Sequence, residues 1–83
     1  MTDVHVGQIW VDNDRRSQGR KIIIEKLYPE FPIGDNVEDN PLIAECRIIA
    51  NPNSPATIGN VTRIRVSRLR PTASGYTLVS ERA

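Results

Sequence analysis

Residues 62–71 read T-R-I-R-V-S-R-L-R-P, a run in which basic and apolar side chains alternate until a proline ends it. Successive side chains of a β-strand point to opposite faces. Ile64 and Val66 are therefore expected to face a core, while Arg63 and Arg65 share the other face. The stretch predicts a strand with a row of guanidinium groups along one side.

The alternation breaks between Val66 and Leu69, which are both apolar at a spacing that no regular strand places on one face. A single helical turn at this point would return Leu69 to the core. The sequence therefore predicts a short helical turn directly after the arginine-rich strand.

Four further segments have the composition of strands, because branched and aromatic residues are concentrated in them. They are residues 4–11, 20–27, 42–50 and 75–80. The three isoleucines at 22–24 are typical of a strand covered on both faces. Gly59 and Asn60 indicate a two-residue hairpin turn over residues 58–61, since both residue types tolerate positive φ.

Turn-forming residues separate these strands. Residues 12–19 form a polar loop, and residues 29–41 form a breaker-rich segment longer than an ordinary hairpin loop. Five short strands, no amphipathic helix and a helical turn before the last strand predict an all-β protein. We expect one domain over residues 1–83, a small five-stranded SH3-like barrel with a long loop after the second strand. An OB-like barrel is the competing fold.

The chain has 83 residues, which fits one small domain with a modest core. A groove or a flat face is therefore expected in place of a deep internal active site. The single cysteine, Cys46, cannot form an internal disulfide, and no leader or long apolar run is present. These features predict a cytoplasmic protein without membrane contact, either a monomer or a small homo-oligomer.

The formal charge of +1 conceals a separation of charge along the chain. Residues 15–26 are basic, residues 27–46 carry five carboxylates and no lysine or arginine, and residues 62–71 are basic again. The basic segments could converge into a positive patch, or the acidic segment could fold over the arginines and pair with them. Mutual neutralisation on a solvated surface is the third possibility.

The sequence offers little for metal or cofactor chemistry. His5 and Cys46 are the only imidazole and thiol ligands, too few to close a zinc site within one chain. No glycine-rich phosphate-binding motif is present. We therefore predict no cofactor, no metal and no catalytic residue.

The loop after the first strand, residues 12–20, has two interpretations. The aspartates are expected to bond local amides, and Asp12 or Asp14 to pair with an arginine from the distant row, which makes the loop structural. Alternatively, Arg15, Arg16 and Arg20 line the rim of a binding groove.

Trp10 is similarly open to two interpretations. It is expected to be the largest core residue. If it is exposed beside the arginines, as Tyr28, Phe31 or Tyr76 could also be, it would instead form a stacking platform for unpaired bases.

Two resemblances accompany this interpretation. Residues 7–20, G-Q-I-W-V-D-N-D-R-R-S-Q-G-R, and residues 62–79, T-R-I-R-V-S-R-L-R-P-T-A-S-G-Y-T-L-V, resemble a family of small uncharacterised proteins from actinobacteria and their phages. That family carries proline where this chain has Arg15. The resemblance implies such an origin and no established activity.

The layout of Gly7-Gln8-Ile9-Trp10 followed by Arg20 and the isoleucines is also similar to the MazF-type toxin endoribonucleases, which are SH3-like barrels. This second resemblance would imply a ribonuclease, with Arg16 or Arg20 as the cation and Asp12 or Asp14 as the base. Lys21 stands where that family has proline, and its later threonine-serine segment is not found here.

The favoured hypothesis is a non-enzymatic protein that binds the phosphate backbone of nucleic acid. The residues predicted to do so are Arg63, Arg65, Arg68 and Arg70, helped by Arg16, Arg20 and Lys21. The alternative is a module that captures a host protein, with Phe31, Ile33 and Val37 of the acidic segment as anchors.

Overall fold

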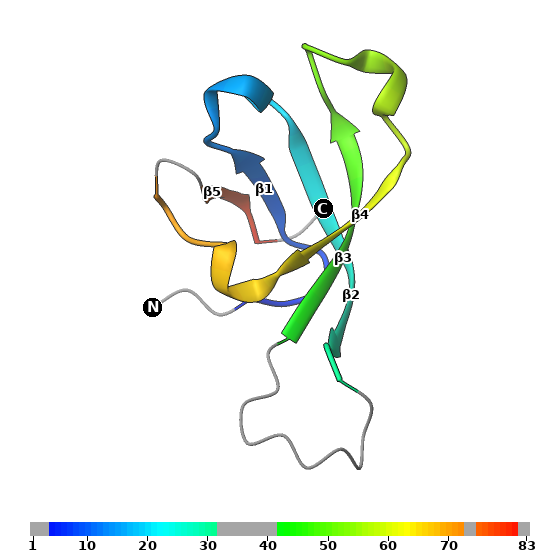
Figure 1. The fold of residues 1–83 in the computed structure, drawn as a ribbon, viewed down its shortest axis with the longest axis vertical. Coiled ribbons are helices and arrows are strands. Elements are labelled where there is room, and N and C mark those ends of the chain that lie inside the picture. The colour runs from blue at the N-terminus through cyan, green and yellow to red at the C-terminus, as the bar shows by residue number, and fades with distance from the viewer. Residues whose placement is uncertain (1–3, 32–41, 73–74, 82–83) are drawn as a thin grey trace.

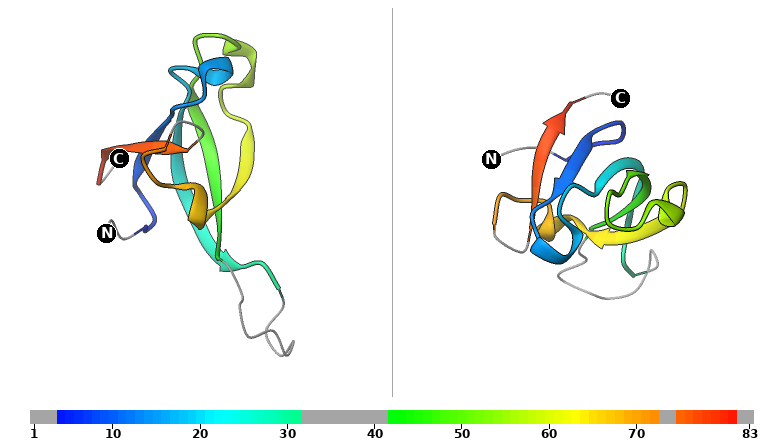
Figure 2. Two further views of the ribbon diagram at one scale, coloured as in Figure 1. Left: turned by 60° about the vertical axis from the view of Figure 1, so that its left-hand side comes forward. Right: turned by 90° about the horizontal axis from the view of Figure 1, so that it is seen from above.

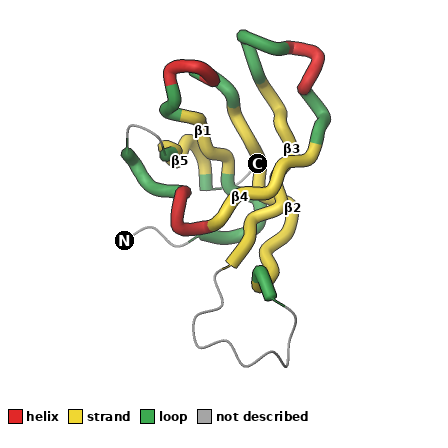
Figure 3. The backbone as a smooth tube through the Cα atoms, viewed as in Figure 1, coloured by secondary structure: helices red, strands yellow, loops and turns green. Residues whose placement is uncertain are grey.

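The computed structural model describes residues 4–31, 42–72 and 75–81 (Figure 1). These residues contain five strands and three short 3-10 turns joined by loops (Figure 3). The strands are β1 (Ile9–Asp12), β2 (Lys21–Pro29), β3 (Leu42–Ala50), β4 (Val61–Arg65) and β5 (Tyr76–Ser80), and the turns are η1 (Arg15–Ser17), η2 (Pro55–Thr57) and η3 (Val66–Arg68).

The strands form one antiparallel sheet in the order β4-β3-β2-β1-β5. This confirms the predicted all-β class and the five strands. Within the described residues β4 and β5 lie at the two ends of this order and do not pair, so the sheet is not closed into the predicted barrel. In that part of the chain, no helix is long and apolar enough to cross a membrane.

The sheet bends at a bulge in β2. β3 pairs with β2 from Lys21 to Pro29, whereas β1 pairs only with the first three residues of β2. The register shifts between Ile24 and Lys26, which leaves Glu25 as an extra residue that turns the strand. Figure 2 shows the result, with β5 crossing away from the long β2–β3 pair.

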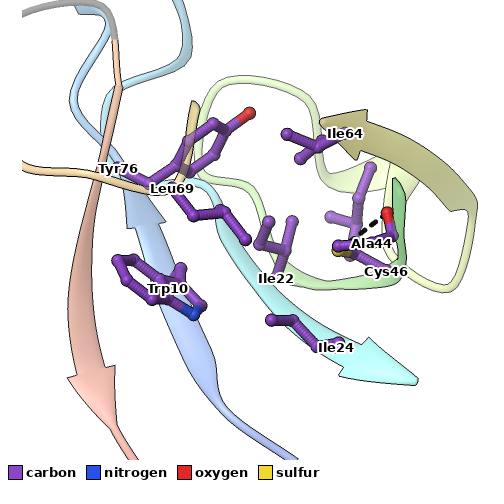
Figure 4. Close-up of a cluster of buried hydrophobic side chains, with 9 residues drawn as sticks. Trp10, Ile22, Ile24, Ala44, Cys46, Ile64, Leu69 and Tyr76 are labelled. Carbon is purple, nitrogen blue, oxygen red and sulfur yellow. Dashed lines mark hydrogen bonds between the residues drawn. The ribbon is translucent and has the colours of Figure 1, made fainter. Parts of the chain in front are cut away.

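The core fills the concave side of this bent sheet (Figure 4). Trp10 is 1% exposed and is the largest of the fully buried side chains, as predicted. The other buried apolar residues come from the remaining strands and from the chain just after η3. They are Ile22, Ile24, Ala44, Cys46, Ile48, Ile64, Leu69 and Tyr76. Trp10 and Tyr76 are thus core residues, which leaves neither ring available as a stacking surface.

The predicted helical turn is confirmed as η3. The Leu69 amide donates to the Val66 carbonyl over 2.9 Å, and the turn brings Leu69 inward to 5% exposure. The chain then doubles back so that the Tyr76 amide donates to the Arg70 carbonyl at 2.9 Å. Gly75 is required there, because a Cβ atom would overlap that same carbonyl oxygen.

Three predicted details are wrong, the simplest being that the second strand continues to Pro29, past its predicted end at Leu27. The first strand begins at Ile9 instead of Val4, because the chain turns at Gly7, whose φ of +97° and hydrogen bond to the Ile24 carbonyl end the extended backbone. Residues 58–61 do not form a hairpin turn either. Gly59 has a positive φ but Asn60 does not, and both bond to Ile48, so they extend the ladder between β3 and β4. The reversal lies earlier, around η2.

Truncation of Leu69 tests the role of η3. We expect Leu69→Ala to lower the free energy of unfolding by about 2–5 kcal/mol, because it leaves a cavity in a small core. Ile58→Ala removes a similar apolar volume from a half-exposed side chain and should change it by less than about 0.5 kcal/mol. Urea unfolding followed by Trp10 fluorescence measures both, and equal losses would contradict an inward Leu69.

Burial raises the pKa of the Cys46 thiol to about 12, with the charge of Glu25 as a smaller cause. Because only the thiolate is nucleophilic, the native protein should not react with a thiol reagent at neutral pH, whereas the unfolded chain should react fully. The raised pKa favours the folded state below the ordinary value of 9.0, and this contribution is lost as the pH rises toward about 12. The unfolding free energy, measured by denaturation across that pH range, should therefore fall more in the unmodified protein than in Cys46→Ala. Rapid labelling of the native thiol at neutral pH would contradict the burial of Cys46.

Candidate functional site

The loop between β1 and β2 is held by its own carboxylates. Asp12 accepts from the Asp14 amide, and Asp14 accepts from the Arg16 amide, each over 2.9 Å. Such side-chain-to-backbone bonds stabilise a turn in place of ladder bonds. The structural interpretation of both aspartates is therefore confirmed.

A buried ion pair closes the same loop. Arg20 Nη2 lies 2.7 Å from Asp12 Oδ2 and donates to the Tyr76 hydroxyl over 2.9 Å. The Asp12 side chain is only 5% exposed. The antiparallel pairing of Val11 with Lys21 brings Asp12 and Arg20 together, because Asp12 follows Val11 and Arg20 precedes Lys21. The partner of Asp12 is therefore Arg20 of the same loop and not an arginine of the distant row.

The pKa of the Tyr76 hydroxyl is raised in this environment. Burial is the main cause that raises the pKa of Tyr76 above its ordinary value of 10.0, and the charge of Asp12 acts in the same direction. The nearby charges of Arg20 and Arg68 oppose the shift. The Arg20 side chain is thus engaged by both Asp12 and Tyr76.

Arg16 makes an exposed pair with Asp14, with 3.1 Å between Nη2 and Oδ2. Hydrogen bonds from Arg16 lower the pKa of Asp14, and the charge of Arg68 contributes to the same shift. Arg68 belongs to η3, so η1 and η3 act on a common carboxylate. Both turns lie on the same side of the sheet (Figures 1 and 2).

Asn13 fastens the β1–β2 loop to the chain that follows η3. Its amide donates to the Gly75 carbonyl and its side chain to the Thr72 carbonyl, both over 3.0 Å. Its Oδ1 accepts from the Thr77 hydroxyl at 2.9 Å. The arginines beside Asn13 and those beside Thr72 are therefore carried by two segments that are bonded to each other.

The two arginines of β4 lie elsewhere, on the outer face of the sheet. Arg63 stands opposite Glu45 in the register, with 3.4 Å between Nη2 and Oε1, and Arg63 Nε donates to the Tyr28 hydroxyl at 3.0 Å. Lys26 reaches the other oxygen of Glu45 at 3.9 Å. Glu45 thus serves two cations in a row across three strands.

Two more pairs continue this pattern. Arg65 Nη2 lies 2.8 Å from Glu30 Oε1, just beyond the end of β2. Arg47 Nε lies 3.0 Å from Glu25 Oε2, and its Nη1 donates to the Gly59 carbonyl at 2.7 Å. Mutual neutralisation therefore describes the outer face of β2, β3 and β4.

The charge of the described residues is not balanced. They contain ten Lys and Arg against six Asp and Glu, a formal net charge of +4. Five of these carboxylates pair with Lys or Arg, and the sixth, Glu81, contacts His5 and Gln8. Within the described chain Arg15, Lys21 and Arg70 have no carboxylate partner, and all three are exposed.

We define the basic rim as Arg15 and Arg16 of η1, Arg68 of η3, and Arg70 just after it. All four side chains belong to exposed residues. The structure thus divides the predicted set into three groups. Arg16, Arg68 and Arg70 belong to the rim, Arg63 and Arg65 lie on the outer face, and Arg20 is half-buried against Asp12. Lys21 is exposed at the start of β2.

Of the three predicted protein-binding anchors, the structure describes only Phe31. Phe31 is 38% exposed beyond the end of β2. Ile33 and Val37 lie outside the described residues. In the described segments no three His, Cys, Asp or Glu side chains are grouped so that they could hold a metal ion.

The sequence did not reveal the partners of the β4 arginines. Glu45 and Arg63 are 18 positions apart, and only the register between β3 and β4 sets them opposite each other. Arg15 appears in the alternative prediction of a groove rim but not in the set predicted to contact phosphate. Its position beside Arg16 in a loop anchored by Asp12 and Asp14 is the signal that could have placed it there.

No protein-family model, curated protein or solved structure matches this chain. The resemblances described under Sequence analysis therefore stay predictions.

Arg20→Ala tests the buried pair. It leaves the Asp12 carboxylate buried without its cation, so we expect a loss of about 3–5 kcal/mol in unfolding free energy. Arg16→Ala is the matched control, because Arg16 also pairs with an aspartate of this loop but is 89% exposed, and it should leave stability nearly unchanged. Chemical denaturation measures both, and comparable losses would show that burial does not govern the Asp12 pair.

Proposed function

We propose that this protein is a non-enzymatic binding protein that contacts the phosphate backbone of nucleic acid through the basic rim. The observation that carries the proposal is the charge imbalance. The described carboxylates are all engaged, yet Arg15 and Arg70 remain exposed without one. An anionic polymer supplies the missing counter-charge.

Guanidinium groups suit this ligand. Their planar donors bind phosphate bidentately, and they stay charged at any physiological pH. The rim presents them on two turns tied together through Asn13, which limits the conformational entropy that binding would cost. Arg16 can contribute as well, since its pair with Asp14 is exposed and easily exchanged.

The outer-face arginines are expected to contribute less. A phosphate that approached Arg63 or Arg65 would have to compete with Glu45 or Glu30, which already accept from them. The carboxylates would also repel it. The binding surface proposed is therefore the rim and not the arginine row of β4.

For the scaffold we propose the SH3-like class. The strand order β4-β3-β2-β1-β5 and the 3-10 turn between the last two strands support this assignment. In such small β folds the loops carry function while the sheet holds them in place. Here η1 and η3 are the segments so held.

Capture of a partner protein is the second candidate. Phe31 and Leu42, the apolar residues that flank residues 32–41, are 38% and 47% exposed. The segment between them carries Asp35, Glu38 and Asp39. Exposed apolar residues beside acidic ones are common in protein interfaces, and this candidate gains if no nucleic acid binds.

Fluorescence anisotropy with a labelled DNA duplex tests the proposal. Affinity should fall steeply with salt, because each neutralised phosphate releases counterions. Arg15→Ala/Arg70→Ala should weaken binding by about tenfold or more and reduce the magnitude of the salt slope by about 2.

Arg63→Ala/Arg65→Ala is the matched control, since it removes the same number of charges from the outer face. We expect a smaller effect on both affinity and salt slope. If the control variant loses as much affinity as the rim variant, the site is misplaced. If the unmodified protein does not bind even at low salt, the proposed function is wrong.

A further inference from the structure

We infer that the ligand of the basic rim is double-stranded nucleic acid, bound in preference to single strands of equal charge. This inference rests on the proposed function and names its substrate class. It follows from where the aromatic side chains of the protein lie.

The chain contains four aromatic residues, and the structure describes all of them. Trp10 is 1% exposed and Tyr76 is 2% exposed, and both rings lie in the core (Figure 4). Neither can stack on a base without unfolding the site. Burial thus removes half of the possible stacking groups.

The remaining two rings do not belong to the rim. The Tyr28 hydroxyl accepts from Arg63 on the outer face of the sheet. Phe31 follows the end of β2 that is far from η1 (Figure 1), next to Glu30, which pairs with Arg65 on the outer face. Residues 12–20 and 66–72, which carry the rim, contain no aromatic residue.

Binding of unpaired strands depends on such rings. Stacking of a base on an aromatic side chain contributes about 1–3 kcal/mol, and single-strand binding proteins combine several of these contacts with a basic groove. A rim of arginines alone offers only charge and phosphate hydrogen bonds. Its affinity should then follow the charge density of the ligand, which is higher for a duplex, with one charge per about 1.7 Å of axis.

The direct test compares a mixed-sequence DNA duplex of about 20 base pairs with a thymidine strand that carries the same number of phosphates. We expect the duplex to bind at least severalfold more tightly at low salt, and a duplex of different sequence to bind equally. Equal or tighter binding of the single strand would overturn this inference and leave the proposed function intact. Binding of neither probe would instead overturn the proposed function.

A designed ring provides a second test. Ser67 is exposed within η3, directly before Arg68 of the rim, so Ser67→Trp adds the missing stacking group. We expect it to tighten single-strand binding by about fivefold or more and to leave duplex binding nearly unchanged. Val79→Trp places the same ring on β5, away from the rim, and should leave both single-strand and duplex binding nearly unchanged. Single-strand affinity that is equal in the two variants would overturn the inference.

Discussion

The ion pair between Arg20 and the buried carboxylate of Asp12 is the interaction on which the arrangement of this protein depends. Arg20 joins the end of β1, through Asp12, to the first residue of β5, through the Tyr76 hydroxyl, while its own backbone leads into β2. Three strands that are separated in the chain thus meet at one charged group. Because Asp12 is buried, this contact cannot be exchanged for water without a large cost. The loop that carries η1 is closed by it, so the place of the exposed arginines is set from the interior.

The ten Lys and Arg in the described part of the chain have different roles according to where the backbone places them. Those on the outer face of β2, β3 and β4 find carboxylates across the strands, which makes that face nearly neutral. Arg15 and Arg70 are carried by turns, where no strand of the described chain supplies an acidic partner. A formal charge close to zero is therefore compatible with a locally positive surface.

The sequence allowed the strands and η3 to be predicted because these are local properties. Leu42–Ala50 was bounded correctly, since breaker residues flank it, and the change of period between Val66 and Leu69 located the turn. Pairing could not be predicted, because the register that sets Glu45 against Arg63 is a tertiary property. Gln8 escaped notice for a similar reason. It is fully buried and accepts from the Trp10 indole at 3.2 Å, a role that appears only once Trp10 has its place in the core.

The change of backbone period at η3 also limits which insertions and deletions the segment between Arg65 and Leu69 can tolerate. Strand residues alternate in steps of two, and the turn resets that phase so that Leu69 packs inward while Arg68 and Arg70 stay outside. An insertion or deletion of one codon between Arg65 and Leu69 would shift the phase and exchange buried with exposed positions. Substitutions at Ser67 preserve it. The spacing of this segment is thus constrained more tightly than the identity of its exposed residues.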